Sequence, residues 1–130
     1  MPITTLYAVP LAMLYVYLSF RVISHRRAAR VEIGDGADRE LLRRMRVHAN
    51  CAEYLPIALV LMGLAESVGA PALVLHGIGA MLLAGRLMHA YALSQTPHIL
   101  RVRVLGMVLT FTAIAIGAAT GLLFAVQRVA

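Results

Sequence analysis

Apolar residues occur in this chain in four long runs, each near the length of a helix that crosses a bilayer. The runs are interrupted by few polar positions and cover residues 3–23, 54–65, 70–93 and 104–126. A bilayer core needs about 20 residues of helix, and the second run reaches that length if its helix continues back to Arg46. The pattern therefore predicts one domain, residues 1–130, with four transmembrane helices at about 3–30, 38–67, 71–94 and 99–127.

Turn and capping residues separate these predicted helices. The sequence Gly34-Asp35-Gly36 is typical of a turn, and Asp38 is placed to cap the start of the second helix. Gly69 and Pro71 mark a short connection before the third helix. In the fourth helix, Gly117 and Gly121 have a spacing that allows close approach of a neighbouring helix.

The composition excludes an ordinary soluble domain. Hydrophobic residues make up 61% of the chain and charged residues only 14%, whereas a soluble domain carries about a quarter charged residues. A soluble chain of this length would have too much apolar surface to bury. We therefore expect an all-α, polytopic membrane protein built as a four-helix bundle. A single cysteine, Cys51, rules out an internal disulfide framework.

The positive charges are grouped in a way that predicts the orientation in the membrane. The net charge is +6 and every basic residue is arginine. Arginines are concentrated around the first connection and again at residues 101 and 103, whereas the second connection, 66–71, has none. Cytoplasmic loops of membrane proteins carry the excess of Lys and Arg. This pattern favours a membrane protein over a nucleic-acid binder, with the first and third connections cytoplasmic and both termini on the opposite side.

Polar residues in the helices are spaced so that they converge. Arg43, Arg46, Asn50 and Glu53 are three or four residues apart, which places them on one face of the second helix. Arg86 and His89 lie near the cytoplasmic end of the third helix, and Arg101 and Arg103 begin the fourth. Because successive helices are antiparallel, we expect these groups at one depth, forming a positively charged pocket open to the cytoplasm.

The chemistry of this pocket suits a small anion with several carboxylates. Arginine forms forked hydrogen bonds with carboxylates, and Glu53 could accept a hydrogen bond from a ligand ammonium group. A cationic site also lowers the pKa of a thiol and so favours the nucleophilic thiolate. Glutathione, with two carboxylates, one amine and one thiol, fits this description.

Structural roles compete with each of these assignments. The arginines of the second helix could serve only as topology determinants that meet anionic headgroups. Glu53 could form a structural ion pair with Arg46 or Arg86, and His89 could be a satisfied interhelical histidine. Cys51 fits a small packing residue better than a nucleophile. No metal site is expected, since the histidines at 48, 76, 89 and 98 lack a compact ligand spacing.

Two motifs resemble those of the MAPEG family, the membrane-associated proteins of eicosanoid and glutathione metabolism. The stretch at residues 46–56, RVHANCAEYLP, resembles the family's second-helix signature, and 85–91, GRLMHAY, resembles its third-helix motif. The Gly34-Asp35-Gly36 turn is similar to that of the bacterial inner-membrane branch. The likeness covers nearly the whole chain.

This resemblance implies a homotrimer with glutathione bound between protomers. It assigns glutathione binding to Arg46, Asn50 and Glu53, places His89 in the same cleft, and gives thiolate stabilisation to Arg103, with Arg101 as the alternative. From its place in the predicted pocket, Arg86 is also expected to bind glutathione. Three positions depart from the pattern. Leu93 and Met107 stand where characterised eukaryotic members have tyrosines, and Ala49 stands where some members have a second arginine.

We therefore expect a glutathione-dependent transferase of the bacterial inner membrane that conjugates or reduces lipophilic electrophiles. Its partners would be glutathione, a lipophilic small molecule, the bilayer and two further copies of the chain, without nucleic acid. The departures at Leu93 and Met107 support a second hypothesis, a glutathione- or anion-binding protein, or a structural one, without catalysis. A third, a small multidrug-type transporter, is disfavoured because its essential glutamate belongs in the first span, and Glu53 lies in the second.

Overall fold

The protein consists of four long helices. The structure is a computed structural model that describes residues 1–97 and 99–130, so His98 lies outside the described residues. Each helix is long and apolar enough to cross a membrane. Their bounds differ from those expected from the sequence by at most two residues at either end: α1 Pro2–Ala28, α2 Arg39–Ser67, α3 Ala72–Ser94 and α4 Leu100–Val129.

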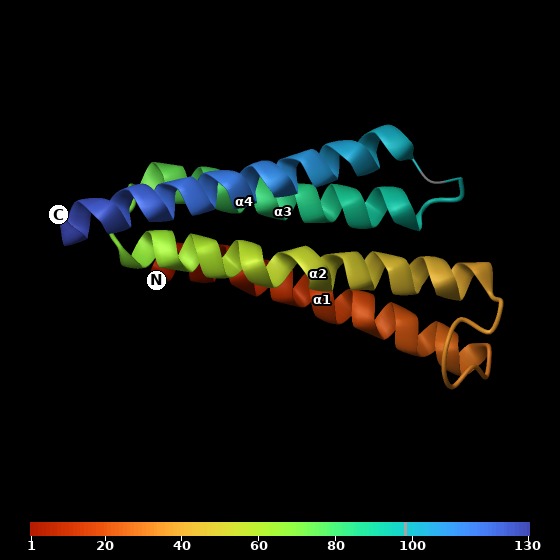
Figure 1. The fold of residues 1–130 in the computed structure, drawn as a ribbon. Helices are drawn as coiled ribbons and strands as arrows, with labels where there is room; N and C mark the ends of the chain where they lie inside the picture. Colours follow the sequence, from red (N-terminus) through yellow and green to blue (C-terminus); the bar gives the residue numbers. More distant parts are fainter. Residues whose placement is uncertain (98) are drawn as a thin grey trace.

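Successive helices run in opposite directions, so each end of the bundle has its own set of connections (Figure 1). The connection 29–38 and residues 95–97 and 99, between α3 and α4, lie at one end, which we call the arginine-rich end. Both termini lie at the other end, together with the short turn between α2 and α3. Helices α1 and α3 therefore run parallel to each other and finish at the arginine-rich end.

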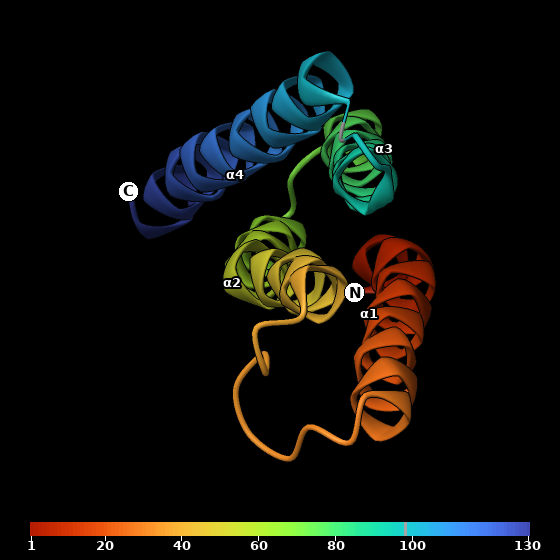
Figure 2. The same ribbon diagram turned by 90° about the vertical axis from the view of Figure 1, so that its right-hand side faces the viewer.

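Helices α2 and α3 form the centre of the protomer. Each of these two helices contacts the other three, whereas α1 and α4 make no contact with each other in the described part of the chain. Viewed along the bundle, α1 and α4 flank the central pair on opposite sides (Figure 2). The buried core lies between α2, α3 and their neighbours and includes Leu11, Leu55, Met62, Leu75 and Leu82.

Carboxylates cap the starts of two helices. The side chain of Asp38 accepts hydrogen bonds from the backbone N–H groups of Glu40 and Leu41 at 2.8 and 3.0 Å, which confirms its predicted role. Glu66, near the end of α2, accepts hydrogen bonds from the backbone N–H groups of Ile3 and Thr4 at 2.9 and 2.8 Å. Because the first N–H groups of a helix lack partners within it, Glu66 fixes the start of α1 against α2.

Helices α3 and α4 approach each other closely at two glycines. A Cβ atom added to Gly106 would lie 2.7 Å from the carbonyl oxygen of Gly85 and 2.8 Å from the backbone nitrogen of His89. Gly117 and Gly121 are the glycines whose spacing predicts close approach, but they pack more loosely. A Cβ atom added to Gly117 would lie 3.6 Å from Leu61 of α2, and one added to Gly121 would lie 3.8 Å from Ala65. The crossing that requires glycine on both helices is therefore the one at Gly85 and Gly106.

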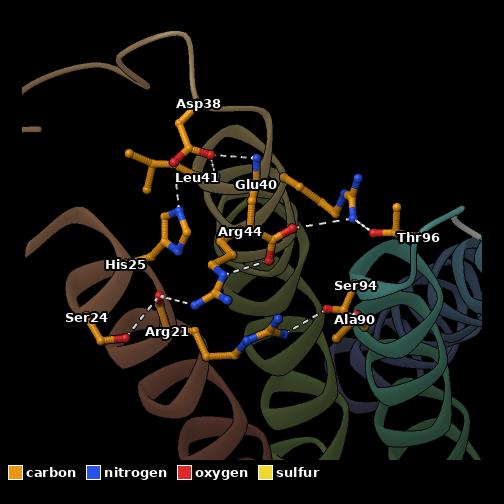
Figure 3. Close-up of polar contacts among 11 residues, drawn as sticks. Arg21, Ser24, His25, Asp38, Glu40, Leu41, Arg44, Ala90, Ser94 and Thr96 are labelled. Carbon is orange, nitrogen blue, oxygen red and sulfur yellow. Dashed lines mark hydrogen bonds and ion pairs between the residues drawn. The ribbon is translucent and has the colours of Figure 1, made fainter. Parts of the chain in front are cut away.

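Polar contacts tie the helix ends together at the arginine-rich end (Figure 3). His25 Nε2 lies 2.9 Å from Asp38 Oδ2, linking α1 to the start of α2. Glu40 forms ion pairs with Arg43 and Arg44 at 3.4 and 2.8 Å. Two contacts reach other elements: Arg44 donates to the Arg21 carbonyl and Arg43 to the Thr96 hydroxyl.

Candidate functional site

A small cavity of about 170 Å³ lies between α2, α3 and α4 toward the arginine-rich end. Four of the residues proposed from the sequence line it, together with one apolar residue: Arg46, Asn50, His89, Arg103 and Leu93. The helical spacing thus gathers one pair of residues from α2, one pair from α3 and one residue from α4 around a common space.

The helix crossing at Gly106 explains how α4 reaches this cavity. Arg46 and Asn50 are one turn apart on α2, as are His89 and Leu93 on α3, so each pair faces one direction. Gly106 lies against the backbone of His89, and Arg103 precedes it by three residues. The absence of a side chain at Gly106 therefore lets α4 approach closely enough for Arg103 to join the lining.

Arg86 lies behind the cavity rather than in its wall. Its side chain is 2% exposed and its Nη1 donates to the Asn50 side-chain oxygen at 2.8 Å. Nε donates to the Thr110 hydroxyl at 3.0 Å, and Nη2 lies 3.2 Å from the Met107 sulfur. With its oxygen held by Arg86, the Asn50 amide is left with its NH₂ group as the free donor, so Arg86 orients the asparagine that lines the cavity.

The cavity is cationic. Arg46 and Arg103 line it, Arg86 stands directly behind Asn50, and no carboxylate is among the lining residues found in the described chain. Guanidinium groups present their donors in a planar fork that matches a carboxylate. The site therefore favours an anion with more than one carboxylate-type oxygen.

Glu53 and Arg101 do not join this cavity within one protomer. Glu53 lies one turn beyond Asn50 but is exposed and makes no ion pair with any described residue. The alternative of a structural ion pair with Arg46 or Arg86 is therefore wrong for the single chain. Arg101 is also exposed, so of the two candidate arginines in α4 it is Arg103 that lines the site.

Two partners of Arg86 were not predicted from the sequence. Thr110 is fully buried, and it and Met107 both contact the guanidinium from α4. Thr110 has only a spacing of four residues from Gly106 as a sequence signal, which is common in any helix, and Met107 was noted only for the tyrosine that the family resemblance leads one to expect there. Cys51 is buried in the core, as expected of a packing residue, and no metal-ligand cluster occurs among residues 1–97 and 99–130.

Four membrane-length helices define a polytopic membrane protein, and a buried arginine and a cationic cavity near one end give it a polar candidate site between the helices. Residues 4–123 match the MAPEG family, and the chain belongs to that family. It is similar to the inner membrane protein YecN of Escherichia coli strain K12, with 43% identity over 112 residues that cover 86% of this chain and 84% of that protein. The YecN protein of E. coli strain CFT073 matches with the same identity and coverage.

Proposed function

We propose that this protein is a glutathione-dependent transferase that conjugates or reduces lipophilic electrophiles in the inner membrane. The observation that carries the proposal is the joint lining of one cationic cavity by Arg46, Asn50, His89 and Arg103. These residues supply donors for carboxylates and a positive charge for a thiolate. The surrounding apolar helices give a lipophilic partner access from the bilayer.

Each lining residue has a distinct role in this proposal. Arg46 forms a forked pair with a glutathione carboxylate, and the Asn50 amide, oriented by Arg86, donates to the peptide. Arg103 stabilises the thiolate, since a nearby cation lowers the pKa of a thiol. His89 lies in the cleft between these groups and contacts the bound peptide.

One protomer supplies only part of such a site. The cavity of about 170 Å³ is smaller than the roughly 300–1,000 Å³ of typical ligand pockets. Glu53 faces outward from the same helix. A carboxylate at membrane depth is costly unless it meets protein or water. A neighbouring protomer beside α2 would enlarge the site and bring Glu53 against the glutathione amine.

An unpartnered stripe on α2 supports this assembly. Six exposed residues recur at intervals of three, four or seven along the whole helix: Leu42, Arg46, Glu53, Ile57, Val60 and Leu64. Such spacing is that of a helix face packed against another helix. We propose a homotrimer in which these stripes face neighbouring protomers, glutathione binds between them, and the arginine-rich end faces the cytoplasm with both termini opposite.

The reaction follows from these positions. The thiol of glutathione loses its proton to water, and the thiolate is held by the charge of Arg103. The sulfur then attacks an electrophilic carbon, forming a C–S bond while the leaving group departs with the electron pair of its broken bond. With a lipid hydroperoxide, the thiolate attacks the terminal oxygen instead. The O–O bond breaks to give glutathione sulfenic acid and a lipid alkoxide, which takes a proton from water to become the alcohol. The thiol of a second glutathione then attacks the sulfenic sulfur, forming the disulfide and releasing water.

Glutathione binding to the purified protein, measured by calorimetry, tests the site. We expect saturable binding that weakens about 10- to 100-fold in Arg46→Ala and in Asn50→Ala, because hydrogen bonds to charged groups contribute roughly 1.5–3 kcal/mol. Arg101→Ala removes the same charge outside the cavity and should bind as wild type does. Absence of binding by a well-folded protein would refute the proposal.

The catalytic role is tested by comparing the two arginines at the start of α4. Arg103→Ala should lower turnover with an electrophile such as 1-chloro-2,4-dinitrobenzene and raise the pKa of bound glutathione, read from thiolate absorbance. Arg101→Ala should change neither. Equal turnover in the two variants, with glutathione still bound, would remove Arg103 from the chemistry.

A second function, glutathione or anion binding without turnover, is favoured by one feature of the cavity. Leu93 contributes an apolar side chain to the lining, and Met107 offers its sulfur to Arg86. At both positions the family resemblance leads one to expect the tyrosines of characterised eukaryotic members. Wild-type protein that binds glutathione tightly but turns over none of a broad panel of electrophiles and hydroperoxides would establish this second function in place of the first.

A further inference from the structure

A second and larger cavity lies between α1 and α3, away from the candidate glutathione site. Its volume is about 420 Å³, within the range of pockets that hold small molecules. The lining comes from one face of each helix: Leu14, Tyr17, Leu18 and Arg21 of α1, and Leu87, Ala90, Tyr91, Ser94 and neighbouring Gln95 of α3. No residue of this cavity lines the other one.

The lining changes from apolar to polar along the membrane normal. Because α1 and α3 are parallel, residues later in either helix lie nearer the arginine-rich end. Leu14 and Leu87 form the deep part, whereas Arg21, Ser94 and Gln95 form the part toward that end. Exposed tyrosines 17 and 91 lie between these parts, as aromatic side chains do at a membrane interface. The cavity is thus amphipathic, with its cation at the shallow end.

The guanidinium of Arg21 has N–H donors that remain available to a ligand. Its Nη1 donates to the Ser94 hydroxyl at 2.8 Å, as Figure 3 shows, and the Ser94 hydroxyl donates in turn to the Ala90 carbonyl. A guanidinium has five N–H donors, and Arg21 forms no ion pair with a described residue. Glu40, the acidic residue on the facing part of α2, is paired with Arg43 and Arg44. The local charge therefore stays positive.

We propose that this cavity binds one anionic phospholipid, with its phosphate on the remaining guanidinium donors of Arg21 and an acyl chain along Leu14, Leu18 and Leu87. An amphiphile with a negatively charged head matches both the charge of the shallow end and the apolar character of the deep end. Basic pockets between transmembrane helices near a membrane surface bind anionic headgroups in this way. The lipid would brace α1 against α3, since the two helices share the lining.

Native mass spectrometry of the detergent-purified protein, titrated with phosphatidylglycerol, tests the proposal. We expect one bound lipid per protomer in the wild type and at least tenfold weaker binding in Arg21→Gln. The control Arg39→Gln removes an exposed arginine at the same end and should retain the lipid. Ala90→Leu keeps every charge but fills the apolar part of the cavity and should also abolish the bound lipid.

Two further results would overturn the proposal. If Arg21→Gln and Arg39→Gln weaken binding equally, the lipid is held by the general positive charge of that end. If glycerol phosphate, which has no acyl chain, displaces the lipid at matched concentration, the site is one for free phosphate. Because the variants lie outside the glutathione cavity, failure here leaves calorimetric glutathione binding unchanged and is distinguishable from failure of the proposed function.

Discussion

Arg86 is the residue on which the candidate site depends most, although it does not touch the cavity. A buried guanidinium is costly unless its donors are satisfied, and here they meet Asn50, Thr110 and Met107 on two different helices. The same contacts join α2 to α4 through α3. Arg86 thus holds the orientation of Asn50, and by our proposal it acts on glutathione through that residue.

Replacing Arg86 by lysine tests this positioning role. Lysine keeps the charge but cannot contact Asn50, Thr110 and Met107 together, so the Asn50 amide should lose its fixed orientation. We expect glutathione affinity to fall about tenfold, equivalent to ~1.4 kcal/mol, in calorimetry. Cys51→Ala, at a buried position beside Asn50 in sequence, is the control and should bind normally. Unchanged affinity in Arg86→Lys would show that Asn50 needs no such support.

Among the helices, α2 begins at a cap whose strength depends on pH. Hydrogen bonds from the Leu41 backbone and from His25, together with the charge of His25, lower the pKa of Asp38 below its ordinary value of 3.8. A carboxylate with a lowered pKa in the folded state contributes stability above its unfolded pKa and loses it as pH falls through the folded value.

Hydrogen exchange of the Leu41 backbone amide reports directly on this cap, because that N–H donates to the Asp38 side chain. We expect wild-type protection to be constant from neutral pH down to about 4 and to fall only below the ordinary aspartate pKa of 3.8, after correction for intrinsic exchange rates. Asp38→Ala should lose the protection at all pH values, while Asp38→Asn should retain part of it without pH dependence. A wild-type midpoint above that ordinary pKa would contradict the direction of the shift.

The crossing of α3 and α4 depends on the absence of a side chain at Gly106. Gly106→Ala places a Cβ atom within 2.8 Å of backbone atoms on α3, and overpacking of this kind costs roughly 1–3 kcal/mol. We expect a lower melting temperature and weaker glutathione binding, because Arg103 moves with α4. Gly117→Ala adds its Cβ 3.6 Å from Leu61 and is the matched control, with stability equal to or above that of the wild type.

The elements were predictable from the sequence where local signals determine them. The lengths of the apolar runs and the cap at Asp38 define the helices, and the intervals between Arg46, Asn50 and His89 indicate shared faces. Other features depend on which helices meet. The interval between Arg86 and His89 gives no indication that Arg86 is buried. A lone glycine such as Gly106 does not indicate which neighbouring helix it contacts. Glu53 was expected with Asn50, and its outward position depends on helix rotation.

The whole protomer is an open arrangement, because α1 and α4 flank the central pair without touching each other in the described chain. The exposed stripe of α2 leaves a further face uncovered. Both observations fit a protein that completes its packing, and by our proposal its ligand site, only when several copies assemble.

Oxidative cross-linking tests the proposed trimer. In a Cys51→Ala background, a cysteine introduced by Val60→Cys on the α2 stripe should cross-link protomers in membranes, since stripes from neighbouring copies meet. Ala84→Cys, at an exposed position of α3, should not. The mass of the detergent-purified protein, from light scattering corrected for detergent, should equal three chains. A monomeric mass would exclude a site shared between protomers.

The position of the two termini at one end of the bundle (Figure 1) has a consequence for genetic design. Copies of this sequence can be encoded in tandem on a single polypeptide with short linkers, because no linker has to cross the bilayer. In such a concatemer, one copy can carry Arg103→Ala while the others stay intact. Activity as a function of the number of intact copies would then show whether the sites act independently or in alternation.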